Sequence, residues 1–105
     1  MQEMSVEEYA LKRHEGWPHL LLDVREANEL AICKIAPHVW IPLGDLSMRL
    51  GELDPDENII VLCHHGGRSA RAVYLLSGRG FDKVWNLVGG IDAYAVRVEP
   101  TLPRY

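Results

Sequence analysis

The sequence predicts an α/β fold with a central parallel sheet of four or five strands and helices on both faces. Short apolar runs alternate along the chain with amphipathic segments of helical period. The strongest apolar run is Ile59 to Leu62, and we read Asn58 to Leu62 as a continuous strand buried on both sides of a parallel sheet. A length of 105 residues suits one domain, and we expect residues 1–105 to form it.

The first half of the chain predicts helices and strands in alternation. Ser5, with Glu8 three residues later, is a helix-start pattern, and this helix should stop near Gly16. A strand over residues 20–22 then ends at Asp23. The remaining elements are a short helix over residues 26–31, a short strand over 39–41 closed by Pro42, and a helical spacing of Leu43, Leu46 and Leu50.

The second half repeats the order of strand and helix. A turn at residues 54–56 leads into the strand over 58–62, and a helix over 69–77 follows. A strand over 83–86, a turn at Gly89-Gly90 and a last helix over 92–96 complete the pattern. Sites in such folds form beyond the carboxyl ends of the parallel strands, so the residues after Leu62 are the first candidates.

Composition and charge exclude several classes of function. The formal net charge is −4 and no block of Lys or Arg is present, so we expect no nucleic-acid partner and no membrane partner. No apolar stretch approaches the roughly 18 residues of a membrane span. The first residues are polar and acidic, unlike a secretory signal, so we expect a cytoplasmic protein. The two cysteines, Cys33 and Cys63, are too few for a disulfide framework.

The loop between the buried strand and the next helix carries the predicted chemistry; it reads Cys63-His64-His65-Gly66-Gly67-Arg68-Ser69. Backbone N–H groups of such a loop can point inward and form an anion-binding nest at the helix N-terminus. Gly66 and Gly67 permit the dihedral angles of a tight curl. These dipoles favour the nucleophilic thiolate of Cys63, and Arg68 adds a cation that can bind an anionic donor. We therefore predict Cys63 as the nucleophile and residues 64–69 as the substrate-binding loop.

The same residues allow other interpretations. Cys63 taken alone fits a buried core residue equally well, and Cys33 is most simply a core residue, with a resolving thiol as the alternative. His64 and His65 can act through backbone N–H groups, which we favour, or through side chains that bind the donor. Ser69 is expected to cap the helix and can also reach the sulfur. The Cys and His spacings match no zinc pattern, so we expect no metal.

Two further segments accompany the Cys63 loop. Leu22-Asp23-Val24-Arg25-Glu26 precedes it, and Asn86-Leu87-Val88-Gly89-Gly90-Ile91-Asp92-Ala93-Tyr94 follows it. Together the three segments resemble the motifs of the rhodanese-like sulfurtransferases, in the same order over nearly the whole chain. The resemblance implies a rhodanese-like fold with a short edge strand around residues 2–4. It also implies that Asp23 and Arg25 support the site through hydrogen bonds, a purely structural ion pair being the alternative.

The resemblance implies that Cys63 takes sulfane sulfur from a small-molecule donor such as thiosulfate, as a persulfide. The sulfur then passes to a thiophilic acceptor, cyanide in vitro or a protein or small thiol in the cell, with no metal or organic cofactor. The alternatives are a cysteine phosphatase or arsenate reductase of the same fold, and a non-enzymatic sulfur-binding or regulatory module. Phosphatases of this fold place one residue more between Cys and Arg than the four found here, residues 64–67. That shorter loop and the presence of both Cys63 and Arg68 favour sulfur transfer.

Overall fold

Five parallel strands form the central sheet of the computed structural model, which describes residues 1–105. They are β1 (Glu3–Met4), β2 (Leu20–Asp23), β3 (Val39–Trp40), β4 (Ile59–Leu62) and β5 (Val84–Leu87). Their order across the sheet is β1-β5-β4-β2-β3, and every neighbouring pair is parallel. The predicted α/β class and the short edge strand at the N-terminus are confirmed.

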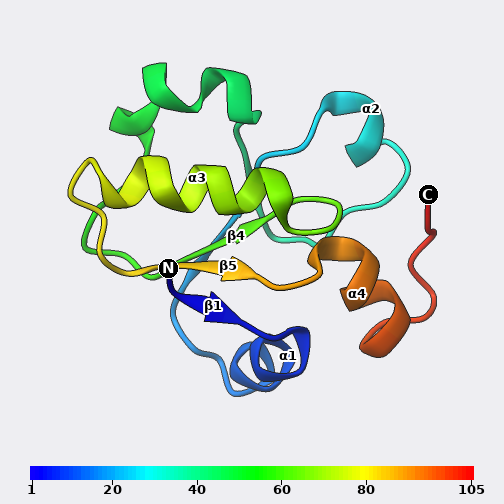
Figure 1. The fold of residues 1–105 in the computed structure, drawn as a ribbon. Coiled ribbons are helices and arrows are strands. Elements are labelled where there is room, and N and C mark those ends of the chain that lie inside the picture. The colour runs from blue at the N-terminus through cyan, green and yellow to red at the C-terminus, as the bar shows by residue number, and fades with distance from the viewer.

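Helical segments cover both faces of the sheet (Figure 1). They are α1 (Val6–His14), α2 (Ala27–Leu30), η1 (Leu43–Met48), η2 (Leu50–Glu52), α3 (Gly67–Ser77) and α4 (Gly90–Arg97), where η marks a 3-10 helix. α3 and η1 pack together on one face, and α1 and α4 pack together on the other. None of the helices combines the length and the apolar composition that a bilayer crossing demands.

The side chains of β4 alternate between two apolar clusters, one on each face of the sheet. Ile59 and Val61 belong to the cluster under α3, whereas Ile60 and Leu62 belong to the cluster under α1 and α4. All four side chains are fully buried, which explains why this run of the sequence is continuously apolar. Cys63 continues the alternation and joins the α3 cluster. The two-residue period of the strand therefore directs Cys63 toward α3.

The segment after β3 differs from the predicted helix. The segment that contains Leu43, Leu46 and Leu50 forms two short 3-10 helices. They are separated at Arg49, whose φ is −117°. The predicted apolar contact is still made, since Leu46 is fully buried. A short connection starting at Pro42 makes the tighter i→i+3 hydrogen bonds, as from Asp45 N–H to the Pro42 carbonyl.

α3 begins two residues before its predicted start. Gly66 occupies the N-cap position with a φ of 112°, and Gly67 is the first helical residue. The prediction that Ser69 caps this helix is wrong, because Ser69 lies inside the first turn. Ser5 does cap α1, since its side chain accepts a hydrogen bond from the Glu8 N–H over 3.0 Å. The other predicted elements end within two residues of the observed bounds.

Replacing Leu76 with Ala should lower the free energy of unfolding by about 2–5 kcal/mol, because a fully buried side chain of α3 leaves a cavity. Tyr74→Ala on the same helix is the matched control, since Tyr74 is 66% exposed. That variant should stay within about 0.5 kcal/mol of the native protein. Urea unfolding followed by circular dichroism measures both. Equal losses in the two variants would contradict the assignment of the buried face.

Candidate active site

The loop after β4 places Cys63 at the carboxyl end of the central strand. Cys63 is 1% exposed. Residues 63–66 lead from β4 directly into the N-terminus of α3 (Figure 1). Gly66 makes this turn in the left-handed region, where a side chain would be strained. The strand, loop and helix predicted around the cysteine are all present.

The Cys63 sulfur contacts two polar groups of the loop and of α3. The Gly66 backbone N–H donates to Cys63 Sγ over 3.0 Å, and Ser69 Oγ lies 3.3 Å from Sγ. The Ser69 hydroxyl also donates to Asn86 Oδ1, and the Asn86 amide donates to the Gly66 carbonyl over 3.2 Å. A backbone N–H directed at the sulfur stabilises negative charge there. Asn86 of β5 holds both Ser69 and Gly66 in place.

The N-terminus of α4 binds the backbone of the same loop. The Ile91 N–H donates to the Cys63 carbonyl over 2.9 Å, and the Asp92 N–H donates to the His64 carbonyl over 3.1 Å. These bonds satisfy N–H groups that have no partner within the helix. Gly90 permits this approach, because a Cβ there would collide with the carbonyl oxygens of Cys63 and His64. α4 therefore fixes two carbonyls of the loop.

Arg68 forms a two-point ion pair with Glu29 of α2. Its Nη1 and Nη2 donate to Glu29 Oε1 and Oε2 over 2.6 and 2.8 Å. The Tyr105 hydroxyl donates to Oε2 over 2.7 Å, and the Glu26 N–H donates to Oε1 over 3.0 Å. The hydrogen bonds from Arg68 lower the pKa of Glu29 to about 2, against the opposing effect of burial. The guanidinium that was expected to meet an anionic donor is thus neutralised by a carboxylate.

A buried ion pair at the end of β2 supports this region. The side chains of Asp23 and Arg25 are both 0% exposed, and Arg25 Nη2 donates to Asp23 Oδ2 over 2.8 Å. Arg25 also donates to the Tyr105 hydroxyl oxygen over 3.0 Å and to the Cys33 carbonyl over 2.9 Å. Arg25 therefore joins β2 to the segment after α2 and to the C-terminal tail. Cys33 itself is a free, buried cysteine.

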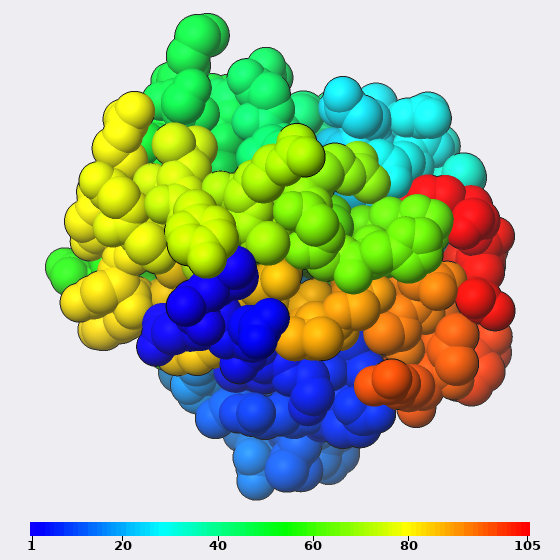
Figure 2. All heavy atoms as spheres, viewed as in Figure 1, coloured from blue at the N-terminus to red at the C-terminus, as the bar shows by residue number.

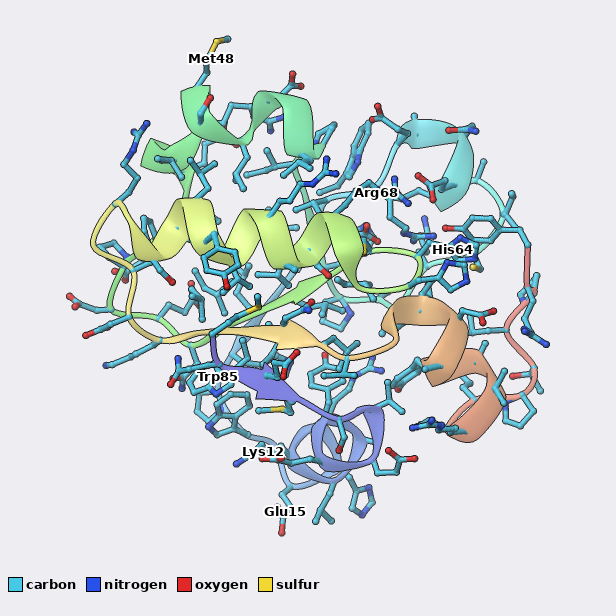
Figure 3. The ribbon with its side chains drawn as sticks, in the orientation of Figure 1. Lys12, Glu15, Met48, His64, Arg68 and Trp85 are labelled. Carbon is cyan, nitrogen blue, oxygen red and sulfur yellow. The ribbon has the colours of Figure 1, made fainter.

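The C-terminal tail lies against the loop. The Tyr105 ring stacks on the His64 ring with centroids 3.9 Å apart, and Arg104 donates to Asp92 of α4 over 2.9 Å. Figure 2 shows the tail (red) beside α2 (cyan) and α4 (orange). Figure 3 shows His64 and Arg68 at this same end of the molecule. Burial lowers the pKa of His64, with a smaller contribution from His65, which favours the neutral ring.

His64, His65 and Asp92 form a cluster of potential metal ligands, with ligand atoms within 4.8 Å of one another. The two imidazole rings stack at an angle of 29° with centroids 3.9 Å apart, so their in-plane lone pairs do not converge on one point. Asp92 is already bound by the Arg104 guanidinium. Both features disfavour a cation at this cluster.

A family model described as "Rhodanese-like domain" matches residues 5–97 of the chain. The chain belongs to the rhodanese-like domain family. The motif resemblance noted from the sequence therefore agrees with a match over most of the chain, and the parallel five-stranded sheet is the rhodanese-like fold.

Relatives of this rhodanese-like domain include parts of longer proteins. "Adenylyltransferase and sulfurtransferase MOCS3-1" of Zea mays is 37% identical over 109 residues, which cover 97% of this chain and 23% of that protein. "Putative sulfur carrier protein YrkF" of Bacillus subtilis (strain 168) is 35% identical over 97 residues, covering 92% of this chain and 52% of that protein. This chain thus spans about a quarter to a half of the length of these curated relatives.

Solved rhodanese-like structures superpose closely. A rhodanese-related protein from Thermoplasma volcanium has a TM-score of 0.86 at 30% identity, covering 95% of this chain and 96% of that one. A rhodanese-like domain protein from Staphylococcus aureus has a TM-score of 0.84 at 30% identity, covering 90% of this chain and 91% of that one.

The structure brings most of the predicted site residues together and adds others. Cys63, Gly66 and Ser69 meet at the sulfur, whereas the His65 side chain is 68% exposed and points to Asp92. Sequence reasoning missed Glu29, Asn86 and Tyr105 as parts of this site. Asn86 gave a signal, since it is a polar residue in an apolar strand and is 5% exposed. Glu29 and Tyr105 gave none, because their contact joins positions 76 residues apart.

Gly90→Ala should lower the stability of the protein and distort the loop around the Cys63 sulfur. A methyl group would collide with the loop carbonyls, and the φ of +62° is strained for Ala, at a cost of about 1–3 kcal/mol. Gly44→Ala is the matched control, because open space surrounds that glycine and no such strain applies. Thermal unfolding and the alkylation rate of Cys63 measure the two effects. If both variants behaved alike, α4 would not shape the loop.

The Glu29–Arg68 pair should make stability depend on pH below neutrality. The pKa of folded Glu29, about 2, lies below that of the unfolded chain, so the contribution is fully present above the unfolded value. It should be lost as the pH falls toward the folded value. The difference in unfolding free energy between the native protein and Glu29→Gln should therefore be largest near neutral pH and shrink between roughly pH 5 and pH 2. Urea titrations across this range test it, and a constant difference would contradict the ion pair.

Proposed function

We propose that this protein is a sulfurtransferase that carries sulfane sulfur as a persulfide on Cys63. The observation that carries the proposal is the 3.0 Å hydrogen bond from the Gly66 N–H to the Cys63 sulfur at the N-terminus of α3. A fixed backbone donor favours the thiolate required for attack. It also stabilises the charge on the persulfide, as an oxyanion hole does in acyl transfer. The amides of residues 64–69 are the proposed binding loop.

The proposed reaction consists of two substitutions at sulfur. The Cys63 thiolate attacks the outer sulfur of the donor, an S–S bond to Cys63 forms, and the donor's own bond to that sulfur breaks. The electron pair leaves with the remainder of the donor. A thiolate or cyanide then attacks the terminal sulfur of the persulfide, and the electron pair of the S–S bond returns to Cys63. The cycle is balanced without any metal or organic cofactor.

The names of the relatives support this class of reaction. The maize relative is named a sulfurtransferase and the Bacillus relative a putative sulfur carrier. We propose a small-molecule donor of sulfane sulfur, a class that includes thiosulfate, and a small thiol or a protein as acceptor. Cys63 is a free cysteine, as formation of a persulfide on it requires, and we propose a cytoplasmic location.

Phosphate hydrolysis fits the site less well. A phosphatase of this kind needs its loop arginine to bind the oxygens of the transferred phosphate. Here both terminal nitrogens of Arg68 are bound by Glu29. The loop between Cys63 and Arg68 also has four residues, one fewer than in phosphatases of this fold.

Cys63→Ser should abolish persulfide formation and thiosulfate:cyanide sulfur transfer while leaving the fold intact. Cys33→Ser is the matched control and should retain most activity, because the Cys33 contact with Arg25 uses its backbone carbonyl. Intact-mass spectrometry after incubation with thiosulfate should find one added sulfur atom in the native protein and in Cys33→Ser only. Loss of that mass in Cys33→Ser rather than Cys63→Ser would overturn the assignment. Hydrolysis of an aryl phosphate faster than sulfur transfer would favour the phosphatase.

A further inference from the structure

Charged side chains of the Cys63 loop and of the segments packed around it form ion pairs of opposite charge. Three carboxylates each bind one guanidinium, with shortest N···O distances of 2.8, 2.6 and 2.9 Å. The pairs are Asp23–Arg25, Glu29–Arg68 and Asp92–Arg104. Burial lowers the pKa of His64, which follows Cys63, and so favours the neutral ring. Each of these three guanidinium groups is therefore compensated by a carboxylate, and the Gly66 N–H is the backbone dipole that meets the sulfur.

Glu29 is held firmly where it neutralises Arg68. Oε1 accepts hydrogen bonds from Arg68 and from the Glu26 N–H, and Oε2 accepts from Arg68 and from the Tyr105 hydroxyl. The Glu29 side chain is 12% exposed, whereas that of Arg68 is 34% exposed. A donor anion that sought Arg68 would have to compete with a carboxylate fixed by four hydrogen bonds.

Donors of sulfane sulfur differ in the charge that they bring to such a site. Thiosulfate is a dianion: attack by the Cys63 thiolate on its outer sulfur gives the Cys63 persulfide anion and sulfite, so like charges gather as the S–S bond forms. A hydropersulfide carries at most one negative charge at its reacting end, and its protonated form R–S–S–H is neutral. Attack on its outer sulfur gives Cys63–S–S–H and the thiolate R–S⁻, and only one negative charge is shared among the reacting atoms. Without a free cation, the second reaction is the less costly.

We propose that Glu29 is a specificity-determining residue that makes this site select hydropersulfides of small thiols over thiosulfate as sulfur donors. The inference rests on the proposed sulfur transfer through Cys63 and specifies its donor. Glu29 acts through Arg68: by neutralising the guanidinium it withdraws the one loop cation that would attract a dianion. Tyr105 contributes by holding Glu29 in place.

The test compares two donors on each protein preparation. Cysteine hydropersulfide and thiosulfate are mixed separately with reduced protein, and the second-order rate of persulfide loading on Cys63 is followed by intact mass. In Glu29→Gln, Arg68 becomes an uncompensated cation, and the thiosulfate rate relative to the hydropersulfide rate should rise about tenfold, as expected for a gained charge-assisted hydrogen bond. Because both rates come from the same preparation, their ratio does not depend on the fraction of folded protein.

Two control variants separate charge from structure. Glu52→Gln removes the same charge from a two-point ion pair with Arg49, on η2, and should leave the ratio unchanged. Glu29→Asp keeps the charge and should keep a ratio close to that of the native protein. A hydropersulfide carried on a protein cysteine serves as a third donor, and a faster rate with it than with cysteine hydropersulfide would overturn the choice of a small thiol.

The results of these experiments separate a wrong choice of donor from a wrong assignment of sulfur transfer. If neither donor loads sulfur on Cys63, the proposed function itself fails. If both load it but the native protein prefers thiosulfate, the donor inference fails while sulfur transfer stands, whether or not Glu29→Gln folds. A ratio in Glu29→Gln equal to that in Glu52→Gln would also overturn the role of Glu29.

Discussion

Two backbone hydrogen bonds from the start of α4, to the carbonyls of Cys63 and His64, hold the loop in the shape on which the site depends. Every peptide of a loop carries both an acceptor and a donor, and a carbonyl oxygen turned toward a thiolate would repel it. Because α4 binds these two carbonyls, the backbone group that meets the sulfur is the Gly66 N–H. The collision that any Cβ at position 90 would make shows how closely the two backbones approach. The helix after β5 thus shapes the loop after β4.

Ion pairs hold the side chains around this loop, and in each pair the charges of the carboxylate and the guanidinium compensate one another. Tyr105 connects two of the pairs, since its hydroxyl accepts from Arg25 and donates to Glu29. Its ring also lies on His64. Burial raises the pKa of Tyr105 to about 12, so the hydroxyl keeps its proton for Glu29 over the physiological range. The backbone group that meets the sulfur, the Gly66 N–H, is a main-chain dipole and does not titrate.

Elements that depend on local pattern could be predicted from the sequence. The continuous apolar run of β4 and the Ser5 cap of α1 are properties of a few neighbouring residues, and both are found. The two 3-10 helices after β3 could not be predicted, because the leucine spacing specifies which side chains are buried and leaves the number of residues per turn open. The start of α3 was misplaced because Ser69 is a good capping residue by type, yet its hydroxyl bonds to Asn86 instead.

The sequence alone determined the class of fold and the loop from which the nucleophile is proposed. Cys63, the glycines that follow it and the strand before it are adjacent in the chain, so their relation is a matter of local geometry. The tertiary structure decided what surrounds the sulfur and which charges reach it. Asn86, Glu29 and Tyr105 come from β5, α2 and the tail, and only the packing of parallel strands brings their side chains to one end of the sheet. Arg68 shows the difference most clearly: its residue type predicts a free cation, whereas a carboxylate 39 positions away neutralises it, and no local pattern encodes that contact.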